Sequence, residues 1–490
     1  MGTRSAPERA AAARAALVGL ALAAVLCGPA WARGEYVGSS GAEVYGHAWV
    51  QAWAADAWPA FAAGTDRAAG AQSWPILDRL PTWIAAGLAQ AVGLRHAWNV
   101  SIAAGVVLAA VGGDALARAV GGDRTVGTVA VPLMPIWLGS LTSGLTEDVA
   151  IGGLALGLAA AVEGRWVRAG AWLGVLAWCG LYLAWLGAVG VAVLGVRAVL
   201  RGRPTLAMFG GAALAAGLAA PAAWAFGGVL DQEPRRPPAV VEPRWPVNPW
   251  RGADVLASVA PGKVDTTGAA VREHPTYLGF VPLGLAVAGG GPAGWLALGA
   301  CVAASYGDDL SVAGTPTGWT NPAAAVLHAL PMGDRFRNHA RIMLLGQLVL
   351  ILLATRGAAR VVAATPRAAW PLALAVAAEV VLVSPARAPL PGTPDAAPAI
   401  YAALATAPPG LPVRVVGSSN PQRPLFDQRW HGRRLLNGPN RPDPGRPHPG
   451  DEIVVAFGPA VERLVGELGT PDAQADGAAA WWPGPVGAGP

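Results

Sequence analysis

Long runs of apolar residues, separated by short polar or proline-containing segments, recur along most of this chain. A helix needs roughly 20 mostly apolar residues to cross a hydrocarbon core of about 30 Å. The pattern therefore predicts an all-α polytopic membrane bundle. About eleven transmembrane helices are expected, near residues 15–32, 99–119, 126–144, 148–163, 169–183, 184–199, 204–228, 276–290, 292–306, 341–355 and 368–385.

Composition agrees with this pattern. Hydrophobic residues make up 53% of the chain and charged residues only 13%, with a mean hydropathy of +0.42. A soluble domain normally carries about 25% charged residues, so a soluble protein is excluded. The basic residues are best explained by membrane topology, and the formal charge of +5 therefore indicates no nucleic-acid partner. Membrane lipids are the expected surroundings.

The distribution of arginine predicts the orientation of the bundle. With a cytoplasmic N-terminus, the inner segments hold thirteen basic and four acidic residues, out of 35 and 30 in the chain. An excess of Arg and Lys in short loops marks the cytoplasmic side of a membrane protein. We therefore expect a multi-pass protein with its N-terminus inside and its C-terminus outside.

The first apolar segment allows two interpretations. Residues 1–32 combine a basic head, an apolar run and a small-x-small end, which is also the pattern of a cleaved signal peptide. We favour an uncleaved first transmembrane helix, because the apolar run is long for a signal. The expected domains then follow: residues 1–32, a first extracytoplasmic loop with an interfacial helix at 33–98, a bundle at 99–385 with outer loops 229–275 and 307–340, and a tail at 386–490.

The tail is expected to form a small extracytoplasmic α/β segment. It holds a helical piece around Tyr401 and strand-like runs at 413–416 and 453–457, and its last residues, 470–490, are expected to be disordered. The aromatic and turn-forming residues between Trp430 and Gly438 predict that the tail packs back onto the outer face of the bundle.

Candidate chemistry begins in the first outer loop. Glu43 and His47 are four residues apart, so on a helix they share one face, together with Gln51. Asp56 lies further along the same loop. A carboxylate in this setting can act as general base toward a sugar hydroxyl. The alternative is a solvated loop whose polar residues pin the end of a helix.

Two acidic pairs are weak candidates for a divalent cation. Glu147 and Asp148 lie at an outer turn, and Asp308 and Asp309 follow the ninth apolar segment. Carboxylate oxygens bind such cations, but acidic pairs are also common in turns, so the presence of a metal stays open.

A basic cluster marks the outer start of the tenth span, where the topology rule does not require positive charge. Its members are Arg335, Arg337, His339 and Arg341. A guanidinium matches the geometry of a phosphate, so the cluster suits a lipid phosphate; the alternative is contact with ordinary headgroups. Glu379, within the last span, is expected to reach toward the outer interface.

These segments together resemble a large group of bacterial polytopic membrane proteins related to the GT-C glycosyltransferases, including the YfhO-like proteins. In the chain's order, the segments that carry the resemblance are Glu43-x-x-x-His47-x-Trp49, Trp74-Pro75, Leu80-Pro81, Ala97-Trp98-Asn99, the helix pair around Trp178 and Trp185, Tyr277 to Pro282, Pro331 to Arg341, and Trp430 to Gly438. The resemblance covers nearly the whole chain.

The resemblance implies a GT-C-like fold in the bacterial inner (cytoplasmic) membrane, a polyprenyl-phosphate sugar as donor and an acidic catalyst in the first outer loop. Glu43 stands where the group commonly has Asp after Gly, and Ala42 replaces that Gly. His339 stands where the group often has Pro. Whether the chain is an enzyme therefore stays open: it is either a transferase for a lipid-linked sugar or a non-enzymatic transporter or assembly factor that keeps only the fold.

Overall fold

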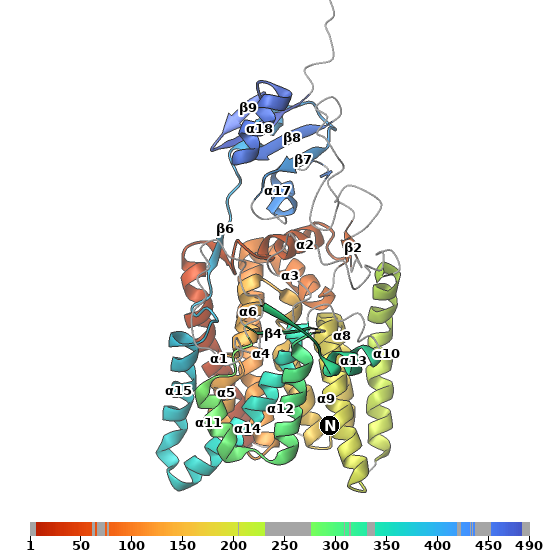
Figure 1. The fold of residues 1–490 in the computed structure, drawn as a ribbon, viewed down its shortest axis with the longest axis vertical. Helices are drawn as coiled ribbons and strands as arrows, with labels where there is room; N and C mark the ends of the chain where they lie inside the picture. The colour runs from red at the N-terminus through yellow and green to blue at the C-terminus, as the bar shows by residue number, and fades with distance from the viewer. Residues whose placement is uncertain are drawn as a thin grey trace, which may run out of the picture.

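The computed structural model shows a helical bundle with a smaller unit of helices and strands above it (Figure 1). Helices α2 (Val44–Asp56) and α3 (Arg79–Val92) lie across the end of the bundle that faces this unit. The structure describes residues 6–60, 64–65, 74–75, 78–203, 205–230, 276–307, 309–312, 315–330, 339–418, 423–431, 433, 435–436 and 452–482.

Six helices in the described ranges are long and apolar enough to cross a membrane. They are α1 (Ala6–Ala32), α4 (Leu94–Ala119), α5 with α6 (Arg124–Ala130 and Pro135–Ser143), α9 (Leu181–Leu200), α10 (Leu206–Leu230) and η3 with α14 (His339–Ile342 and Met343–Ala364).

Every segment expected to span the membrane contains a helix, but five of these helices have only 10 to 14 residues. A helix of that length does not cross a bilayer unaided, so the count of eleven spans stays a prediction. The five are α7 (Ile151–Val162), α8 (Trp166–Cys179), α11 (Phe280–Gly289), α12 (Pro292–Ser305) and α15 (Ala369–Leu382).

The other described elements are short. They are β1 (Glu35–Val37), β2 (Gly64–Thr65), β3 (Trp74–Pro75), η1 (Thr146–Asp148), β4 (Asp309–Val312), β5 (Thr315–Thr320), α13 (Pro322–Ala329), η4 (Pro366–Ala368), β6 (Gly392–Pro394), α16 (Ile400–Ala403), η5 (Leu404–Thr406), β7 (Val413–Val416), α17 (Arg423–His431), β8 (Ile453–Phe457), α18 (Pro459–Leu468), β9 (Ala473–Ala475) and β10 (Ala478–Trp481).

Proline divides the third apolar segment into α5 and α6. Pro132 lacks an amide hydrogen and follows the end of α5, and Pro135 opens α6 at a position where no hydrogen bond is needed. The amide of Ile136 donates to Gln347 Oε1 of α14 at 3.2 Å. A side chain of a neighbouring helix thus satisfies a backbone group that the break exposes.

Small residues let α4 approach its neighbours closely. A Cβ added to Gly112 would lie 2.5 Å from the carbonyl oxygen of Gly152 in α7, and one added to Gly113 would lie 2.1 Å from that of Gly127 in α5. Small residues at helix contacts are typical of membrane bundles, where close backbone packing stabilises association. The glycines of α4 therefore fix its place at the centre of the bundle.

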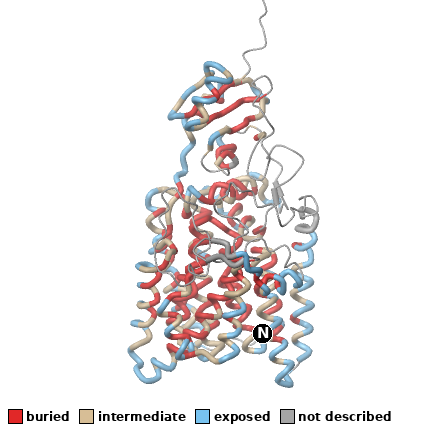
Figure 2. The backbone as a smooth tube through the Cα atoms, viewed as in Figure 1, coloured by how far each residue is buried: buried red, intermediate tan, exposed pale blue. Residues whose placement is uncertain are grey.

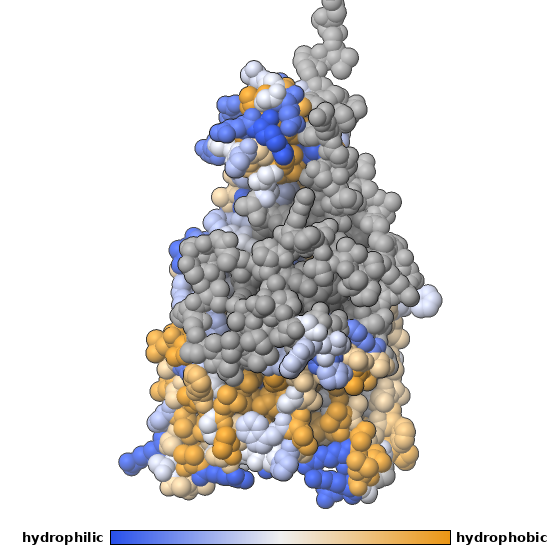
Figure 3. All heavy atoms as spheres, viewed as in Figure 1, coloured by the Kyte–Doolittle hydropathy of each residue, from blue (hydrophilic) through white to orange (hydrophobic). Residues whose placement is uncertain are grey.

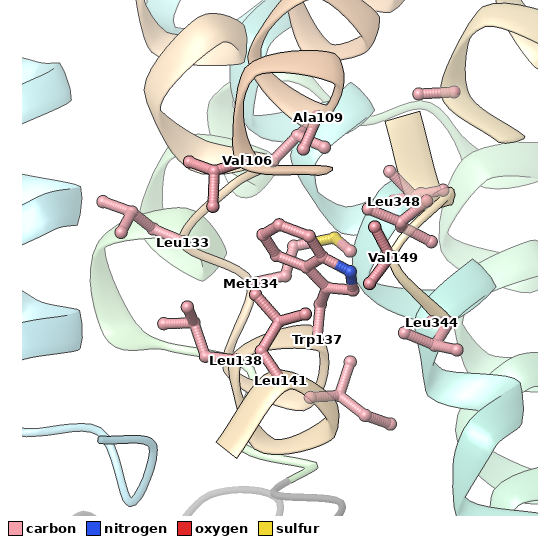
Figure 4. Packing of buried hydrophobic residues seen from close by; sticks show 14 of the residues in the cluster. Val106, Ala109, Leu133, Met134, Trp137, Leu138, Leu141, Val149, Leu344 and Leu348 are labelled. Atoms are coloured by element: carbon pink, nitrogen blue, oxygen red, sulfur yellow. The ribbon is translucent and has the colours of Figure 1, made fainter. Parts of the chain in front are cut away.

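Around α6, large apolar side chains fill the space between the central helices. Figure 4 shows Trp137 enclosed by Val106, Leu133, Val149 and Leu348, which come from separate elements. The indole nitrogen of Trp137 donates to the backbone oxygen of Asp148 at 2.8 Å. Figure 2 shows this buried interior continuing through the bundle, while α10 is exposed along much of its length.

Exposed apolar side chains lie where a membrane would cover them. Leu206, Phe209 and Trp224 of α10 and Leu382 of α15 are all exposed. On the face drawn in Figure 3, hydrophobic residues cover much of the lower part of the bundle, with hydrophilic residues at its lower edge. The connections α9–α10 and α14–α15 lie at this lower end, opposite the C-terminal unit (Figure 1). This arrangement is that of a membrane protein.

A short sheet joins the first loop to the start of the tail. Strand β1 pairs antiparallel with β6, with Tyr36 opposite Thr393. The side chain of Asn99 in α4 makes two hydrogen bonds to the backbone of β1. Its Oδ1 accepts the amide hydrogen of Val37 at 2.9 Å, and its Nδ2 donates to the backbone oxygen of Glu35 at 2.9 Å. The two ends of the bundle sequence are therefore tied together beside α2.

The C-terminal unit contains a four-stranded sheet in the order β7-β8-β10-β9. Strands β7 and β8 are parallel, and the other pairs are antiparallel. The strands β7 and β8 occupy the ranges that the sequence pattern predicts. The unit also packs on the bundle, because Trp49 and Val50 of α2 belong to the same apolar cluster as Tyr401, Val413 and Val455.

The expectation that residues 470–490 are disordered is wrong for 473–481, which form β9 and β10; residues 483–490 lie outside the described ranges. Asp476 and Gly477 connect these strands with φ values of 49° and 72°. An Asp-Gly pair suits a two-residue hairpin turn because both positions require positive φ. The Asp-Gly dipeptide is a sequence signal for this hairpin, whereas the composition of residues 470–490 led to the expectation of disorder.

Candidate functional site

Glu43 and His47 lie together at the start of α2, as their spacing predicts. Oε2 of Glu43 is 3.4 Å from Nε2 of His47. The Glu43 side chain is 38% exposed, whereas that of His47 is only 16% exposed. Nδ1 of His47 lies 2.9 Å from the hydroxyl of Thr146 in η1. His47 therefore connects the partly exposed carboxylate to the turn between α6 and α7.

His47 is a cation at neutral pH. Burial alone would lower the pKa of its imidazole, but the hydrogen bond to Glu43 and the charges of Asp78, Glu43 and Glu147 outweigh burial and raise the pKa to about 9. In that form both ring nitrogens carry a hydrogen and can donate, one to the Glu43 carboxylate and the other to the Thr146 hydroxyl. Glu43 is the more exposed member of the pair.

Backbone bonds place Glu43 beside the acidic turn. The amide of Ser39 donates to the oxygen of Thr142 at 2.6 Å, and the amide of Glu43 donates to that of Ser143 at 2.9 Å. Gly144 then ends α6 with φ of 76°, and an added Cβ there would lie 2.7 Å from Cα of Val44. The first loop and the end of α6 can approach this closely because position 144 has no side chain.

Glu147, within this turn, forms a buried ion pair with Arg341. NH1 of Arg341 donates to Oε1 of Glu147, and the two side chains are 7% and 6% exposed. The guanidinium also lies over the Tyr182 ring, 4.5 Å from its centroid. Burial raises the pKa of Glu147, and the charge of Arg341 opposes this shift. The pair joins η1 to η3, the short helix before α14, across 194 residues of sequence.

Asp148, the last residue of η1, is completely buried. Its Oδ2 accepts a hydrogen bond from Ser140 at 2.8 Å and lies 4.0 Å from Nε of Arg341. The turn needs a glycine opposite it, because a Cβ at Gly180 would lie 2.3 Å from the oxygen of Glu147. The junction between α8 and α9 thus closes one side of the candidate site.

The other predicted residues are placed differently. Asp56 is exposed at the far end of α2, and a helix rises about 1.5 Å per residue, so it does not join the pair at the start of the same helix. Arg335, Arg337 and Asp308 lie outside the described residues, as does the side chain of Asp309.

His339 is buried in η3, two residues before Arg341. Its Nε2 is 3.3 Å from Nε2 of His328 in α13. His339 and Arg341 are therefore buried, where the sequence suggested a site for a lipid phosphate or contact with ordinary headgroups.

Among the described residues, no group of three or more His, Cys, Asp or Glu side chains is arranged to hold a metal ion. Glu147 and Asp148 use oxygens on Arg341 and Ser140. Glu147 and Asp148, the candidate metal ligands whose side chains the structure describes, are thus bonded to protein side chains.

Two polar residues have roles that the sequence did not reveal. Asp78, directly before α3, is 2% exposed, and its charge acts on His47. Glu379 was expected to reach toward the interface, which is wrong. It is buried and accepts hydrogen bonds from the Tyr277 hydroxyl at 2.7 Å and from the amide of Val281 at 2.9 Å. It caps the beginning of α11, a role that depends on contacts distant in sequence.

Comparison with known proteins adds one likeness. No protein-family model matches the chain, and no curated protein matches it. Among solved structures, the chain is similar to the crystal structure of ArnT from Cupriavidus metallidurans in the apo state. The two share 14% sequence identity with a TM-score of 0.42, over 96% of each chain. A likeness of this degree establishes neither a common fold nor a common activity.

Proposed function

We propose that this chain is a membrane glycosyltransferase of the GT-C type that transfers a sugar from a polyprenyl-phosphate donor to an extracytoplasmic acceptor. The observation that carries the proposal is the Glu43–His47 pair, a solvent-facing carboxylate held by an imidazolium at the outer end of an apolar bundle. The sequence resemblance supports the same reaction and the same orientation.

In the proposed reaction Glu43 accepts the proton of an acceptor hydroxyl. The acceptor oxygen then forms a bond to the anomeric carbon of the donor sugar, and the bond from that carbon to the phosphate oxygen breaks. The polyprenyl phosphate leaves with the bonding electrons, and the configuration at the anomeric carbon inverts. Glu43 fits the role of base because its side chain is partly exposed, while its partner His47 is already protonated.

The donor phosphate is proposed to bind near Arg341, with Arg337 and His339 as further contacts. Arg341 lies in η3, directly before α14, and its Nε–H has no hydrogen-bond partner among the described residues. A guanidinium carries five N–H donors, so it can bind Glu147 and a phosphate oxygen together.

Replacement of the carboxylate tests the proposal. Glu43→Gln keeps the size of the side chain and removes its basic oxygen, so transfer is expected to fall by roughly 10²–10⁴-fold. The assay is transfer of labelled sugar from polyprenyl-phosphate donors in membranes that hold each variant, with Asp56→Asn as a control because Asp56 lies at the other end of α2. Wild-type turnover by Glu43→Gln would refute Glu43 as base.

One observation favours a second function. The Glu147–Arg341 pair is buried and internally matched, which also suits a non-enzymatic transporter or envelope assembly factor that keeps the fold alone. The same assay separates the two, because a protein of that kind transfers no sugar from any polyprenyl-phosphate donor, with or without Glu43.

A further inference from the structure

Three buried side chains near the Glu43–His47 pair present polar atoms that make no hydrogen bond within the described part of the chain. Gln51 is 1% exposed, and neither its amide nitrogen nor its amide oxygen has a partner. Asp78 and Thr82 are both 2% exposed, and neither Oδ2 of Asp78 nor Oγ1 of Thr82 has a hydrogen-bond partner. Native proteins satisfy most buried polar groups, so this group points to a ligand.

The three side chains belong to two facing helices. Gln51 is one turn beyond His47 on α2, and Thr82 is one turn beyond Asp78 at the start of α3, so each pair shares a helix face. The two helices contact each other along their length. Gln90 of α3 donates to the oxygen of Ala55 at 2.8 Å.

The charge of Asp78 acts on His47, which places the first turn of α3 beside the first turns of α2. Gln51, one turn further along α2, therefore lies on the side of that helix that faces Asp78 and Thr82. The unpartnered atoms thus lie between the two helices on the side of His47, the partner of the carboxylate proposed as base.

We propose that Gln51, Asp78 and Thr82 form a subsite that binds the hydroxyl groups of a neutral sugar and selects which sugar is accepted. The inference rests on the proposed function for the class of ligand. An amide both donates and accepts, a carboxylate accepts and a hydroxyl does both. Together they match neighbouring sugar hydroxyls, each of which is also a donor and an acceptor.

The charge around the subsite favours a sugar without a carboxylate. The four carboxylates of Glu43, Asp78, Glu147 and Asp148 outnumber the three cations of His47, Arg79 and Arg341 within a mostly buried region. Like charges in a region of low dielectric repel strongly. A uronic acid is therefore expected to bind more weakly than the neutral sugar with the same hydroxyl pattern.

The test uses the full-length protein in lipid nanodiscs and measures binding of methyl glycosides by calorimetry. The panel is methyl glucoside, methyl galactoside, methyl mannoside and the methyl glycoside of glucuronic acid. At least one neutral glycoside is expected to bind in the millimolar range and more tightly than the glucuronide. Gln51→Ala and Asp78→Asn should each weaken it about tenfold, the effect of losing one hydrogen bond of ordinary strength.

Matched variants separate binding from folding. Gln90→Ala removes the same side chain from the same helix pair at a position that is already hydrogen-bonded, and sugar affinity should not change. Thr82→Val keeps the shape of the side chain and should lower affinity, whereas Thr82→Ser restores the hydroxyl and should recover it. This second pair of variants decides the question if Gln51→Ala or Asp78→Asn does not fold.

Failure of this inference is distinct from failure of the proposed function. It is overturned if no neutral glycoside binds, if the glucuronide binds more tightly, or if the subsite variants bind like the wild type, which would leave water as the only occupant. Sugar binding that depends on Gln51, without transfer from any donor, would refute the transferase and leave the subsite. Transfer with an unchanged donor KM in all subsite variants would refute the subsite alone.

Discussion

The charge on His47 depends on carboxylates from three elements: Glu43 at the start of α2, Asp78 before α3 and Glu147 in η1. Only the first of these was visible in the sequence, because four-residue spacing brings Glu43 to the same helix face. The other two approach His47 through the fold. The sequence therefore predicted the pair but assigned His47 no particular protonation state.

The raised pKa of His47 predicts how stability varies with pH. The folded state binds this proton more tightly than the unfolded chain, whose imidazole has a pKa near ~6.5. The stabilisation is fully present below that value and is lost as the pH rises through about 9. We expect wild-type protein in nanodiscs to melt at lower temperature at pH 10 than at pH 6.

His47→Gln is the control for this prediction, because glutamine keeps hydrogen-bonding capacity but does not titrate between these pH values. Its melting temperature should change less between pH 6 and pH 10 than that of the wild type. An equal change in both proteins would show that other groups cause the pH dependence.

The ion pair of Glu147 and Arg341 corrects an expectation about Arg341. From the sequence, Arg341 belongs to a basic cluster at the membrane surface, suited to a lipid phosphate or to ordinary headgroups. In the structure it is buried against Glu147. Removing one partner of a buried pair leaves an uncompensated charge and typically costs about 3–5 kcal/mol.

Arg341→Ala is therefore expected to destabilise the protein by an amount of that order, measured as the shift of the thermal unfolding midpoint in nanodiscs. The double variant Glu147→Gln with Arg341→Gln should be more stable than Arg341→Ala, because it removes the Glu147 charge together with its partner and leaves only Asp148, which keeps its hydrogen bond from Ser140. Arg341→Ala with wild-type stability would mean that the pair is not formed in the membrane.

Among the elements, hydropathy predicted where helices lie better than where they break. Each expected apolar segment contains a helix, yet α8 and α9 separate at Gly180, and α5 and α6 separate near Pro132. Proline is readable in a sequence. The need for glycine at position 180 is not, because it arises from the carbonyl of Glu147, which lies far away in the sequence.

The contact of α17 with α2 could be predicted only in outline. The aromatic segment around Trp430 indicated that the tail packs back, but the partner was unknown. Arg423 of α17 donates to the Tyr45 hydroxyl at 2.5 Å and to Asp427 at 2.7 Å, and Gln428 accepts the indole N–H of Trp49 at 3.1 Å. The helix that carries Glu43 and His47 is thus held from above by the tail.

Loss of Arg423 should loosen this contact. Asp427 is buried, and its pKa is raised to about 6, because burial outweighs the opposing charge and hydrogen bond of Arg423. Arg423→Ala is expected to speed hydrogen exchange of α2 and α17 at pH 7 and to leave α4 unchanged. Arg463→Ala, an exposed arginine of α18, is the matched control, and equal exchange in both variants would contradict the role of Arg423.

On the scale of the whole molecule, burial and hydropathy describe a bundle within a membrane and a C-terminal unit outside it. The connections that carry Arg201 and Arg367 lie at the end of the bundle opposite that unit (Figure 1). The arginine bias along the sequence predicts the same division into two sides. Which side is cytoplasmic remains a prediction from the positive-inside rule.

Reporter fusions test that orientation. Alkaline phosphatase, which is active only outside the cytoplasm, is expected to be active when fused after Pro391, at the start of the tail, and inactive when fused after Arg203, between α9 and α10. A cytoplasmic fluorescent reporter should give the reverse result at the same two positions, which controls for expression. Phosphatase activity at Arg203 without activity at Pro391 would invert the topology. It would also move Glu43 to the cytoplasmic side, where the proposed transfer to an extracytoplasmic acceptor could not take place.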